Sequence, residues 1–121
     1  MDLEGNVDQV PIFVYDSRSP DVTVFPSIHQ AEISLEPNDL DEHLLIYDEV
    51  GRRLLATPRW SDYSVHIQCG ESVPTHLLDL HHALIAHFRA AAVPEGWLEQ
   101  ASTTDLIERA LRVGSKYWGA K

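Results

Sequence analysis

The chain has 121 residues, 44% of them hydrophobic, which is enough to build the core of one ordinary domain. Its formal net charge of −10 at pH 7 argues against binding to DNA, RNA or a membrane of anionic lipid, because each of these would repel it. A single cysteine excludes an internal disulfide and a metal cluster of thiolates, and no apolar run reaches the roughly 18 residues of a membrane span.

The negative charge is concentrated in one part of the chain. Residues 1–51 contain 12 acidic side chains and one basic one, Arg18, whereas residues 52–121 contain 7 acidic and 8 basic ones. The two parts therefore carry formal charges of −11 and +1. An uneven distribution of this kind produces a directed electrostatic field, which favours the binding of a basic partner.

The beginning of the chain predicts a flexible segment followed by a hairpin. Residues 1–8 are expected to form a flexible acidic N-terminus, and residues 9–121 a single domain. Residues 9–16 and 21–25 are rich in β-branched and aromatic side chains, and the residues between them (Ser, Arg, Ser and Pro) are typical of turns. Two antiparallel strands joined by a turn are therefore predicted here.

The next segment predicts a short helix and a second hairpin. Residues 28–35 place apolar side chains on one helical face, and Pro37 would end this helix after about two turns. Residues 43–48 and 52–56 are then predicted to be strands, because Gly51 between them can adopt the left-handed conformation that closes a short hairpin loop.

Residues 63–69 alternate between apolar and polar side chains, which predicts a half-buried fifth strand. Val65, Ile67 and Cys69 would share the buried face of this strand, and His66 would lie on the other face. Cys69 is therefore expected to be a small core residue rather than a nucleophile activated by histidine.

The apolar period changes from two residues to about 3.6 in the last third of the chain. Residues 74–93 predict a helix with a stripe of Leu, Phe and Ala, in whose first turn Pro74 is tolerated. Ser102 and Asp105 resemble a capping box, which predicts the start of a final helix.

These elements predict an α+β fold. We expect an antiparallel sheet of about five strands, with two C-terminal helices packed on one face and a short helix between the hairpins. The other face of the sheet is expected to be partly open to water.

The acidic stretch between Arg18 and Arg52 is the candidate contact surface, because it contains no Lys or Arg at all. Its carboxylates could meet Arg and Lys of a partner in charge-assisted hydrogen bonds, and neighbouring aromatic side chains could serve as anchors. The candidate carboxylates are Glu32, Glu36, Asp39, Asp41, Glu42, Asp48 and Glu49. The candidate aromatic anchors are Tyr47, Trp60 and Tyr63. The alternative is an acidic face that only keeps the protein soluble.

Four of the seven histidines lie in the helix predicted at residues 74–93. They are His76, His81, His82 and His87. A helix that binds a metal places its ligands three or four residues apart, and only Asp79 and His82 have that spacing. No metal site is expected, although a small metal-binding or ligand-binding enzyme that uses this helix remains the alternative.

Catalytic motifs are missing from the sequence. It contains no Gly-rich phosphate loop, no G-x-S-x-G elbow and no H-E-x-x-H helix. We therefore expect the protein not to be an enzyme and to use no cofactor.

The chain contains VFPSIHQAEISLEP at residues 24–37 and LIYDEVGRRL at residues 45–54, followed by two predicted C-terminal helices. This arrangement resembles small bacterial immunity proteins encoded beside polymorphic or contact-dependent toxins. The resemblance implies a protein without catalytic activity that binds one cognate toxin tightly and blocks its active site or substrate surface. It transfers no individual residue to a specific role.

Charge and resemblance together predict a cytoplasmic, non-catalytic protein-binding module that neutralises a basic partner. The expected partner is a cognate toxin domain, such as a nuclease or an effector that uses a nucleotide. Carboxylates of residues 32–49 would then occupy the cationic surface that the toxin uses for phosphate.

Overall fold

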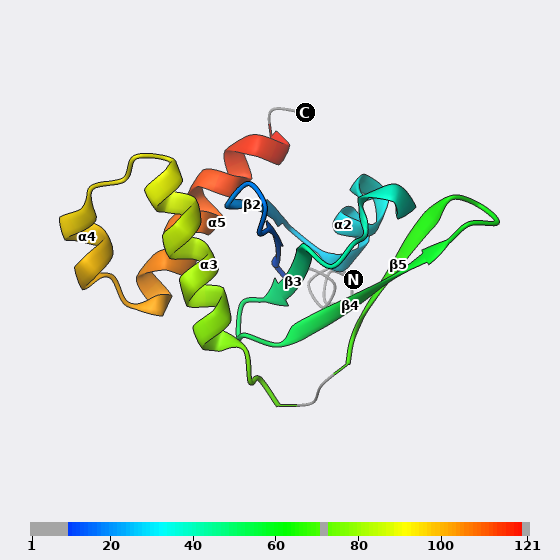
Figure 1. The fold of residues 1–121 in the computed structure, drawn as a ribbon, viewed down its shortest axis with the longest axis horizontal. Coiled ribbons are helices and arrows are strands. Elements are labelled where there is room, and N and C mark those ends of the chain that lie inside the picture. The colour runs from blue at the N-terminus through cyan, green and yellow to red at the C-terminus, as the bar shows by residue number, and fades with distance from the viewer. Residues whose placement is uncertain (1–9, 71–72, 120–121) are drawn as a thin grey trace, which may run out of the picture.

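The protein is built on one open antiparallel sheet (Figure 1). The computed structural model describes residues 10–70 and 73–119, so the predicted flexible segment at residues 1–8 lies outside the described residues. The sheet has five strands in the order β2-β1-β3-β4-β5, and all neighbours are antiparallel, as predicted. The strands are β1 (Ile12–Asp16), β2 (Asp21–Phe25), β3 (Leu44–Asp48), β4 (Arg53–Arg59) and β5 (Ser64–Cys69).

Helices occupy both the middle and the end of the chain. They are α2 (Ile28–Ser34), the short 3-10 helix η1 (Pro37–Asp39), α3 (Leu77–Ala90), α4 (Glu95–Gln100) and α5 (Thr103–Gly119). The predicted short helix and two C-terminal helices correspond to α2, α3 and α5. The structure differs in two details: α3 begins only at Leu77, after Pro74, and the connection to α5 contains the short helix α4.

Capping residues explain where two of the helices begin. The Ser27 hydroxyl accepts the N–H of Gln30 (3.1 Å) and caps α2. At the start of α5, Ser102 Oγ accepts the N–H of Asp105 (3.1 Å), and Asp105 Oδ2 accepts the N–H of Ser102 (3.0 Å). These reciprocal bonds form the predicted capping box.

The last hairpin is longer than the sequence predicts. β4 continues through Pro58 to Arg59, whereas β3 pairs with β4 only at Leu54 and Arg53. Pro58 lies beyond the part of β4 that pairs with β3. Its missing N–H therefore removes no hydrogen bond between these two strands. The β4–β5 hairpin extends away from the C-terminal helices α3, α4 and α5 in Figure 1.

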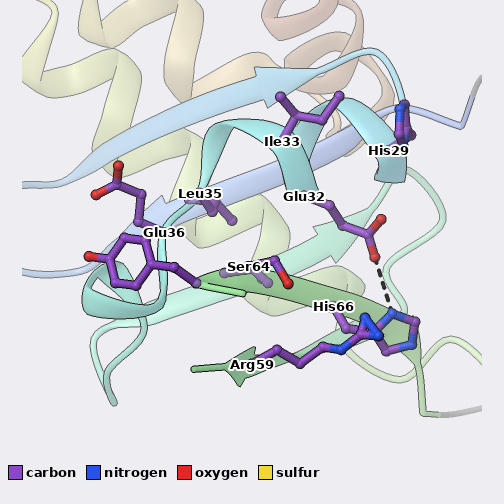
Figure 2. A pocket seen from close by; sticks show the side chains of 10 residues that line it. His29, Glu32, Ile33, Leu35, Glu36, Arg59, Ser64 and His66 are labelled. Carbon is purple, nitrogen blue, oxygen red and sulfur yellow. Dashed lines mark ion pairs between the residues drawn. The ribbon is translucent and has the colours of Figure 1, made fainter. Parts of the chain in front are cut away.

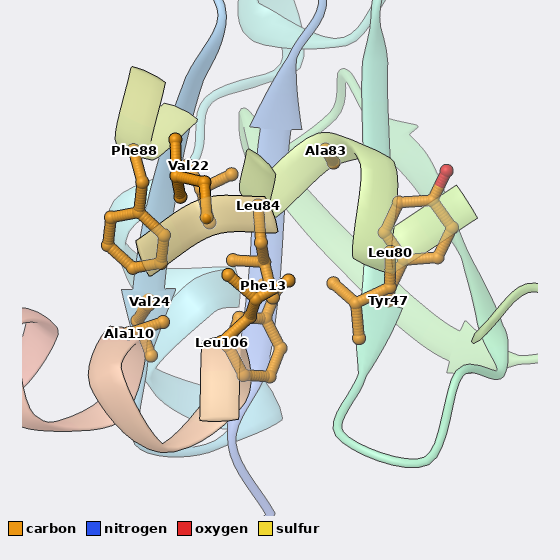
Figure 3. Packing of buried hydrophobic residues seen from close by; sticks show 11 residues of the cluster. Phe13, Val22, Val24, Tyr47, Leu80, Ala83, Leu84, Phe88, Leu106 and Ala110 are labelled. Atoms are coloured by element: carbon orange, nitrogen blue, oxygen red, sulfur yellow. The ribbon is translucent and has the colours of Figure 1, made fainter. Parts of the chain in front are cut away.

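The first hydrophobic core lies between the sheet and the C-terminal helices (Figure 3). Phe13 of β1, Leu80 and Leu84 of α3 and Leu106 of α5 are fully buried at its centre. Each such leucine contributes roughly 2 kcal/mol of transfer free energy. The other members are Val22, Val24, Tyr47, Ala83, Phe88, Leu98 and Ala110.

A second hydrophobic core lies on the opposite face of the sheet, under α2. It joins Ala31 of α2 to Ile46 of β3 and to Val65 and Ile67 of β5, all of them buried. The sequence did not predict that α2 covers the centre of this face, whereas the acidic side chains at its margin remain open to water. The central strands β1 and β3 are apolar on both faces because both of their faces are covered, whereas β2, β4 and β5 carry exposed residues on one face.

Five side chains predicted to be buried are exposed: Cys69 in β5, and Leu77, Leu78, Ala91 and Ala92, which the sequence placed in the apolar stripe of residues 74–93. Cys69 lies at the end of β5 and is exposed, because the core under α2 includes Val65 and Ile67 but not this last residue of the strand. Leu77 and Leu78 are 42% and 65% exposed, since the first core layer begins only with Leu80.

Candidate functional site

A groove beside the turn of the β1–β2 hairpin gathers several carboxylates. It has a volume of about 350 Å³, and four carboxylates and one guanidinium line it, which leaves a formal charge of −3. These groups belong to Asp16, Asp21, Asp39, Asp41 and Arg18. The apolar part of the lining consists of Val14, Phe25, Leu35 and Leu44. We call this hollow the acidic groove.

The β1–β2 hairpin contributes half of these carboxylates. Asp16 and Asp21 are cross-strand partners at the end of the two strands, so their side chains lie close together. Arg18 in the turn lies between two carboxylates: its Nε is 3.3 Å from Asp16 Oδ1, and its Nη1 is 3.3 Å from Asp41 Oδ2. One guanidinium therefore compensates only part of the negative charge of the groove.

Asp16 is held in its ionised form. The backbone N–H of Arg18 donates to Asp16 Oδ1 (3.0 Å), and this hydrogen bond, followed by that of the Arg18 side chain, lowers the pKa of Asp16. Because a lowered carboxyl pKa favours the charged form, Asp16 keeps its negative charge at neutral and mildly acidic pH.

The segment after α2 contributes the other two carboxylates. Asp39 Oδ2 accepts the N–H of Glu36 (2.8 Å), and Asp41 Oδ1 accepts the N–H of His43 (2.8 Å). Each side chain is exposed and keeps a second oxygen that makes no such backbone bond. The structure therefore orients both of these predicted residues while leaving them accessible.

The tip of the β4–β5 hairpin places two exposed aromatic rings next to the acidic groove. Trp60 is 61% exposed and Tyr63 is 46% exposed, and their ring centroids lie 6.1 Å apart. Asn38, which lines the acidic groove, donates from Nδ2 to Tyr63 Oη (2.8 Å). The groove therefore adjoins these two rings, which we call the aromatic tip.

A second hollow, of about 420 Å³, lies between α2 and β5 (Figure 2). Its lining carries both signs of charge, with Glu32, Glu36 and Arg59 beside two histidines. Tyr63 also lines it, so it borders the aromatic tip. The structure thus places Glu36 near the aromatic tip but outside the acidic groove.

Three of the predicted carboxylates, Glu42, Asp48 and Glu49, line neither hollow. The Glu42 side chain is 86% exposed and lies 3.6 Å from His43 Nε2. Glu49 lies in the turn between β3 and β4, at the other end of β3 from Asp41. A strand of five residues spans roughly 13 Å, so Glu49 is separated from the acidic groove by the length of β3.

Glu32 has a structural role that its place in the acidic stretch does not reveal. Its Oε2 accepts the backbone N–H of Ile67 (2.8 Å) and lies 3.4 Å from His66 Nδ1. The side chain is only 24% exposed. It is therefore directed at β5 rather than at a partner.

The prediction that Asp48 and Tyr47 contact a partner is wrong, because both side chains are buried and only 3% exposed. Asp48 Oδ1 accepts the N–H groups of Val50 and Arg52 (3.1 and 2.8 Å), and its Oδ2 pairs with Arg52 Nε (2.7 Å). These contacts close the β3–β4 turn. Tyr47 belongs to the first core, where burial raises the pKa of its hydroxyl. Neither side chain is accessible to a partner protein.

Sequence reasoning missed three residues of this surface: Asp16, Asp21 and Asn38. Asp16 precedes the stretch that lacks basic residues. Asp21 lies within this stretch but was not among the candidate carboxylates. The register of the predicted hairpin could have revealed both, because residues at the matching ends of two strands become neighbours. No local signal indicates that Asn38 bonds to a tyrosine far along the chain.

The histidines of α3 make contacts that stabilise the fold. His87 Nδ1 accepts the backbone N–H of Val22 (3.0 Å), and His81 Nδ1 lies 2.8 Å from Thr103 Oγ1. Burial lowers the pKa of His87, although the Asp21 carboxylate at 3.4 Å acts in the opposite direction. His87 is therefore neutral at neutral pH, as its role as a hydrogen-bond acceptor requires.

A groove of about 370 Å³ runs between α3 and the sheet. The polar groups in its lining come from Tyr15, Tyr47, Arg53, His76, Asp79 and His82. Across residues 10–70 and 73–119, no three His, Cys, Asp or Glu side chains come together as a metal site requires.

No protein-family model matches the chain, and no match is found among curated proteins or solved structures. Within the described part of the chain, none of the helices has both the length and the apolar content needed to span a bilayer.

Proposed function

We propose that this protein is a non-catalytic binding module that neutralises a basic protein through the acidic groove and the aromatic tip. One observation carries the proposal: Asn38 lines the groove and bonds to Tyr63, so a surface of excess negative charge is joined to two exposed aromatic rings. Interfaces commonly combine aromatic anchors with charged pairs in this way.

Lys and Arg side chains of the partner would enter the acidic groove. Their aliphatic stems would cover the apolar lining and their charged groups would bond to the carboxylates of Asp39 and Asp41, at Asp41 in place of Arg18. Arg18 already lies between Asp16 and Asp41, which is the geometry proposed for a partner's guanidinium. The aromatic tip would supply the apolar contact that slows dissociation.

The class of partner follows from chemistry and from the resemblance to immunity proteins. A nuclease or a nucleotide-using toxin needs a cationic surface for phosphate, and carboxylates in the same positions would block it. We therefore propose a cytoplasmic immunity protein whose partner is a basic toxin domain encoded by a neighbouring gene.

The association rate with that neighbouring gene product tests the electrostatic part of the proposal. The variant Asp39→Asn/Asp41→Asn keeps amide oxygens that can accept the same backbone N–H groups but removes two charges. We expect its association rate to fall roughly tenfold at low salt and to depend less on salt than that of the unchanged protein.

The matched control is Glu99→Gln/Glu108→Gln, which removes two charges from exposed positions of α4 and α5. This variant should associate almost as fast as the unchanged protein. An equal fall of the association rate in both variants would show that the net charge of the protein, and not the acidic groove, sets this rate. A partner without excess basic charge would contradict the proposal altogether.

The alternative, a small ligand-binding enzyme that uses the histidine-rich helix, is favoured by the groove beside α3. Arg53, two tyrosines and two histidines there could hold a small molecule with a phosphate or carboxylate group. Calorimetric titration with inorganic phosphate tests this alternative. Phosphate binding that is lost in Arg53→Met would support the alternative. If the protein does not bind phosphate, the groove beside α3 no longer favours it.

A further inference from the structure

Each of the two outer strands of the sheet donates a hydrogen bond from a backbone N–H to the side chain of a helix residue. On β2, the N–H of Val22 donates to His87 Nδ1 of α3 (3.0 Å). On β5, the N–H of Ile67 donates to Glu32 Oε2 of α2 (2.8 Å). The outward N–H and C=O groups of an edge strand are a ready template for pairing with another chain, so contacts at this position limit association.

The register shows which backbone groups of β5 face outward. Ile67 lies opposite Ala56, and Val65 lies opposite Pro58, which has no N–H to offer. The N–H and C=O of one residue in an antiparallel strand point to the same side, and the side alternates along the strand. Because the N–H of Ile67 bonds outside the sheet, the backbone groups of Val65 and Cys69 share that outward direction, and these three residues form the outer edge of β5.

The structure holds the Glu32 carboxylate firmly at this edge. Ala31, the neighbour of Glu32 on α2, is fully buried in the second core together with Val65 and Ile67 of β5. The Glu32 side chain is 24% exposed, and His66 Nδ1 lies 3.4 Å from the bonded oxygen (Figure 2). A partly buried carboxylate at this position accepts the N–H of Ile67, and it also repels the carbonyl oxygens of an approaching strand.

Without this carboxylate, β5 would be suited to pairing with a copy of itself. Its residues, Ser-Val-His-Ile-Gln-Cys, include no Asp, Glu, Lys or Arg, although the chain as a whole carries −10. Val65 and Ile67 are β-branched and favour extended backbone. Two such strands can therefore meet without repulsion between like charges, whereas β2 carries Asp21 and contacts α3 and α5.

We propose that the Glu32 carboxylate closes the free edge of β5, and that an open edge pairs antiparallel with the β5 strand of a second copy of this chain. A twofold axis at Ile67 would place His66 opposite Gln68 of the second copy. The inference does not depend on the proposed partner, since it rests on the Glu32–Ile67 hydrogen bond and on the register of β5.

Sedimentation velocity over a range of concentrations tests the inference with Glu32→Ala. We expect the unchanged protein to stay monomeric and the variant to form dimers with an association constant at least roughly tenfold higher. The matched control is Glu36→Ala, because Glu36 lines the same hollow but makes no bond to β5. This control should remain monomeric.

A second variant tests the geometry of the pairing. Adding His66→Lys and Gln68→Lys to Glu32→Ala would place two pairs of positive charges opposite each other in the proposed dimer. These two positions are exposed, so the fold should tolerate both lysines. We expect the triple variant to return to the monomer. A triple variant that still dimerises would contradict β5 pairing.

The measurements also separate loss of the edge contact from loss of the fold. Circular dichroism reports whether Glu32→Ala is folded, and Glu32→Gln, with its weaker neutral acceptor, serves if it is not. In either variant, hydrogen exchange of the Ile67 amide should be faster in the monomer than in the unchanged protein. It should become slower as the protein concentration rises, because the dimer protects this amide. A folded variant that stays monomeric, with exchange independent of concentration, would overturn the inference.

Discussion

Carboxylates that look equivalent in the sequence differ in what they can do once folded. Asp48 is buried and bonds to two backbone N–H groups and to Arg52, whereas Asp41 is exposed and shares Arg18 with Asp16. Burial decides between these roles, because a buried carboxylate needs its hydrogen bonds for stability and an exposed one can exchange them for a partner's. Charge in the sequence therefore locates candidates, and the structure selects among them.

Gly51 is the residue at which a minimal change should cost the most stability. Its φ is +89°, and a Cβ there would lie 2.6 Å from Leu77 Cα and 2.7 Å from Leu77 N. Both the backbone strain and the collision with α3 oppose a side chain, so Gly51→Ala should lower the free energy of unfolding by about 2 to 4 kcal/mol. Urea denaturation measures this change.

Gly96→Ala is the control for this prediction. Gly96 lies in α4, and a Cβ there would have nothing within 4 Å. Alanine favours helices over glycine by up to about 1 kcal/mol, so this variant should equal or exceed the stability of the unchanged protein. Similar losses at both positions would contradict the close approach of the β3–β4 turn to α3.

At the scale of elements, the sequence predicted what local chemistry determines. Gly51 and the Ser102–Asp105 capping box mark a turn and the start of a helix, and the structure contains both of these features. The second core under α2 and the exposure of Cys69 were not predictable in this way. Both depend on which helix covers which part of the sheet, and this is decided by contacts between segments far apart in the chain.

The contact between α3 and the edge of β2 predicts a dependence of stability on pH. Burial lowers the pKa of His87, so the unfolded chain binds a proton more readily than the folded one. The contribution of neutral His87 is thus fully present above the ordinary histidine pKa of about 6.5 and is lost as the pH falls through its lowered folded value. Protonation of Nδ1 would break the bond from the Val22 N–H.

Melting temperatures of the unchanged protein and of His87→Gln, measured from about pH 8 down to about pH 5, test this prediction. Glutamine can still accept from Val22 but does not titrate, so its melting temperature should fall less over this range. The other histidines are the same in both proteins, so their contributions cancel in the comparison. Parallel curves would show that His87 does not provide the pH-dependent contribution.

At the scale of the molecule, the separation of charge becomes a surface only through the fold. The acidic run predicted Asp39 and Asp41, but the groove also needs Asp16 and Asp21, which the β1–β2 hairpin adds from another segment. The aromatic tip needs the β4–β5 hairpin to extend towards Asn38. The proposed class of partner therefore rests on composition, whereas the proposed place of contact depends on long-range register.

Amide hydrogen exchange of the protein with and without its basic partner tests the proposed contact surface most directly. We predict slower exchange in the partner's presence around residues 16–21, 38–43 and 60–63, where the acidic groove and the aromatic tip lie. The amides of α4 and the outer side of α5 should exchange at unchanged rates. Protection confined to the C-terminal helices, with no change at the groove or the tip, would contradict the account.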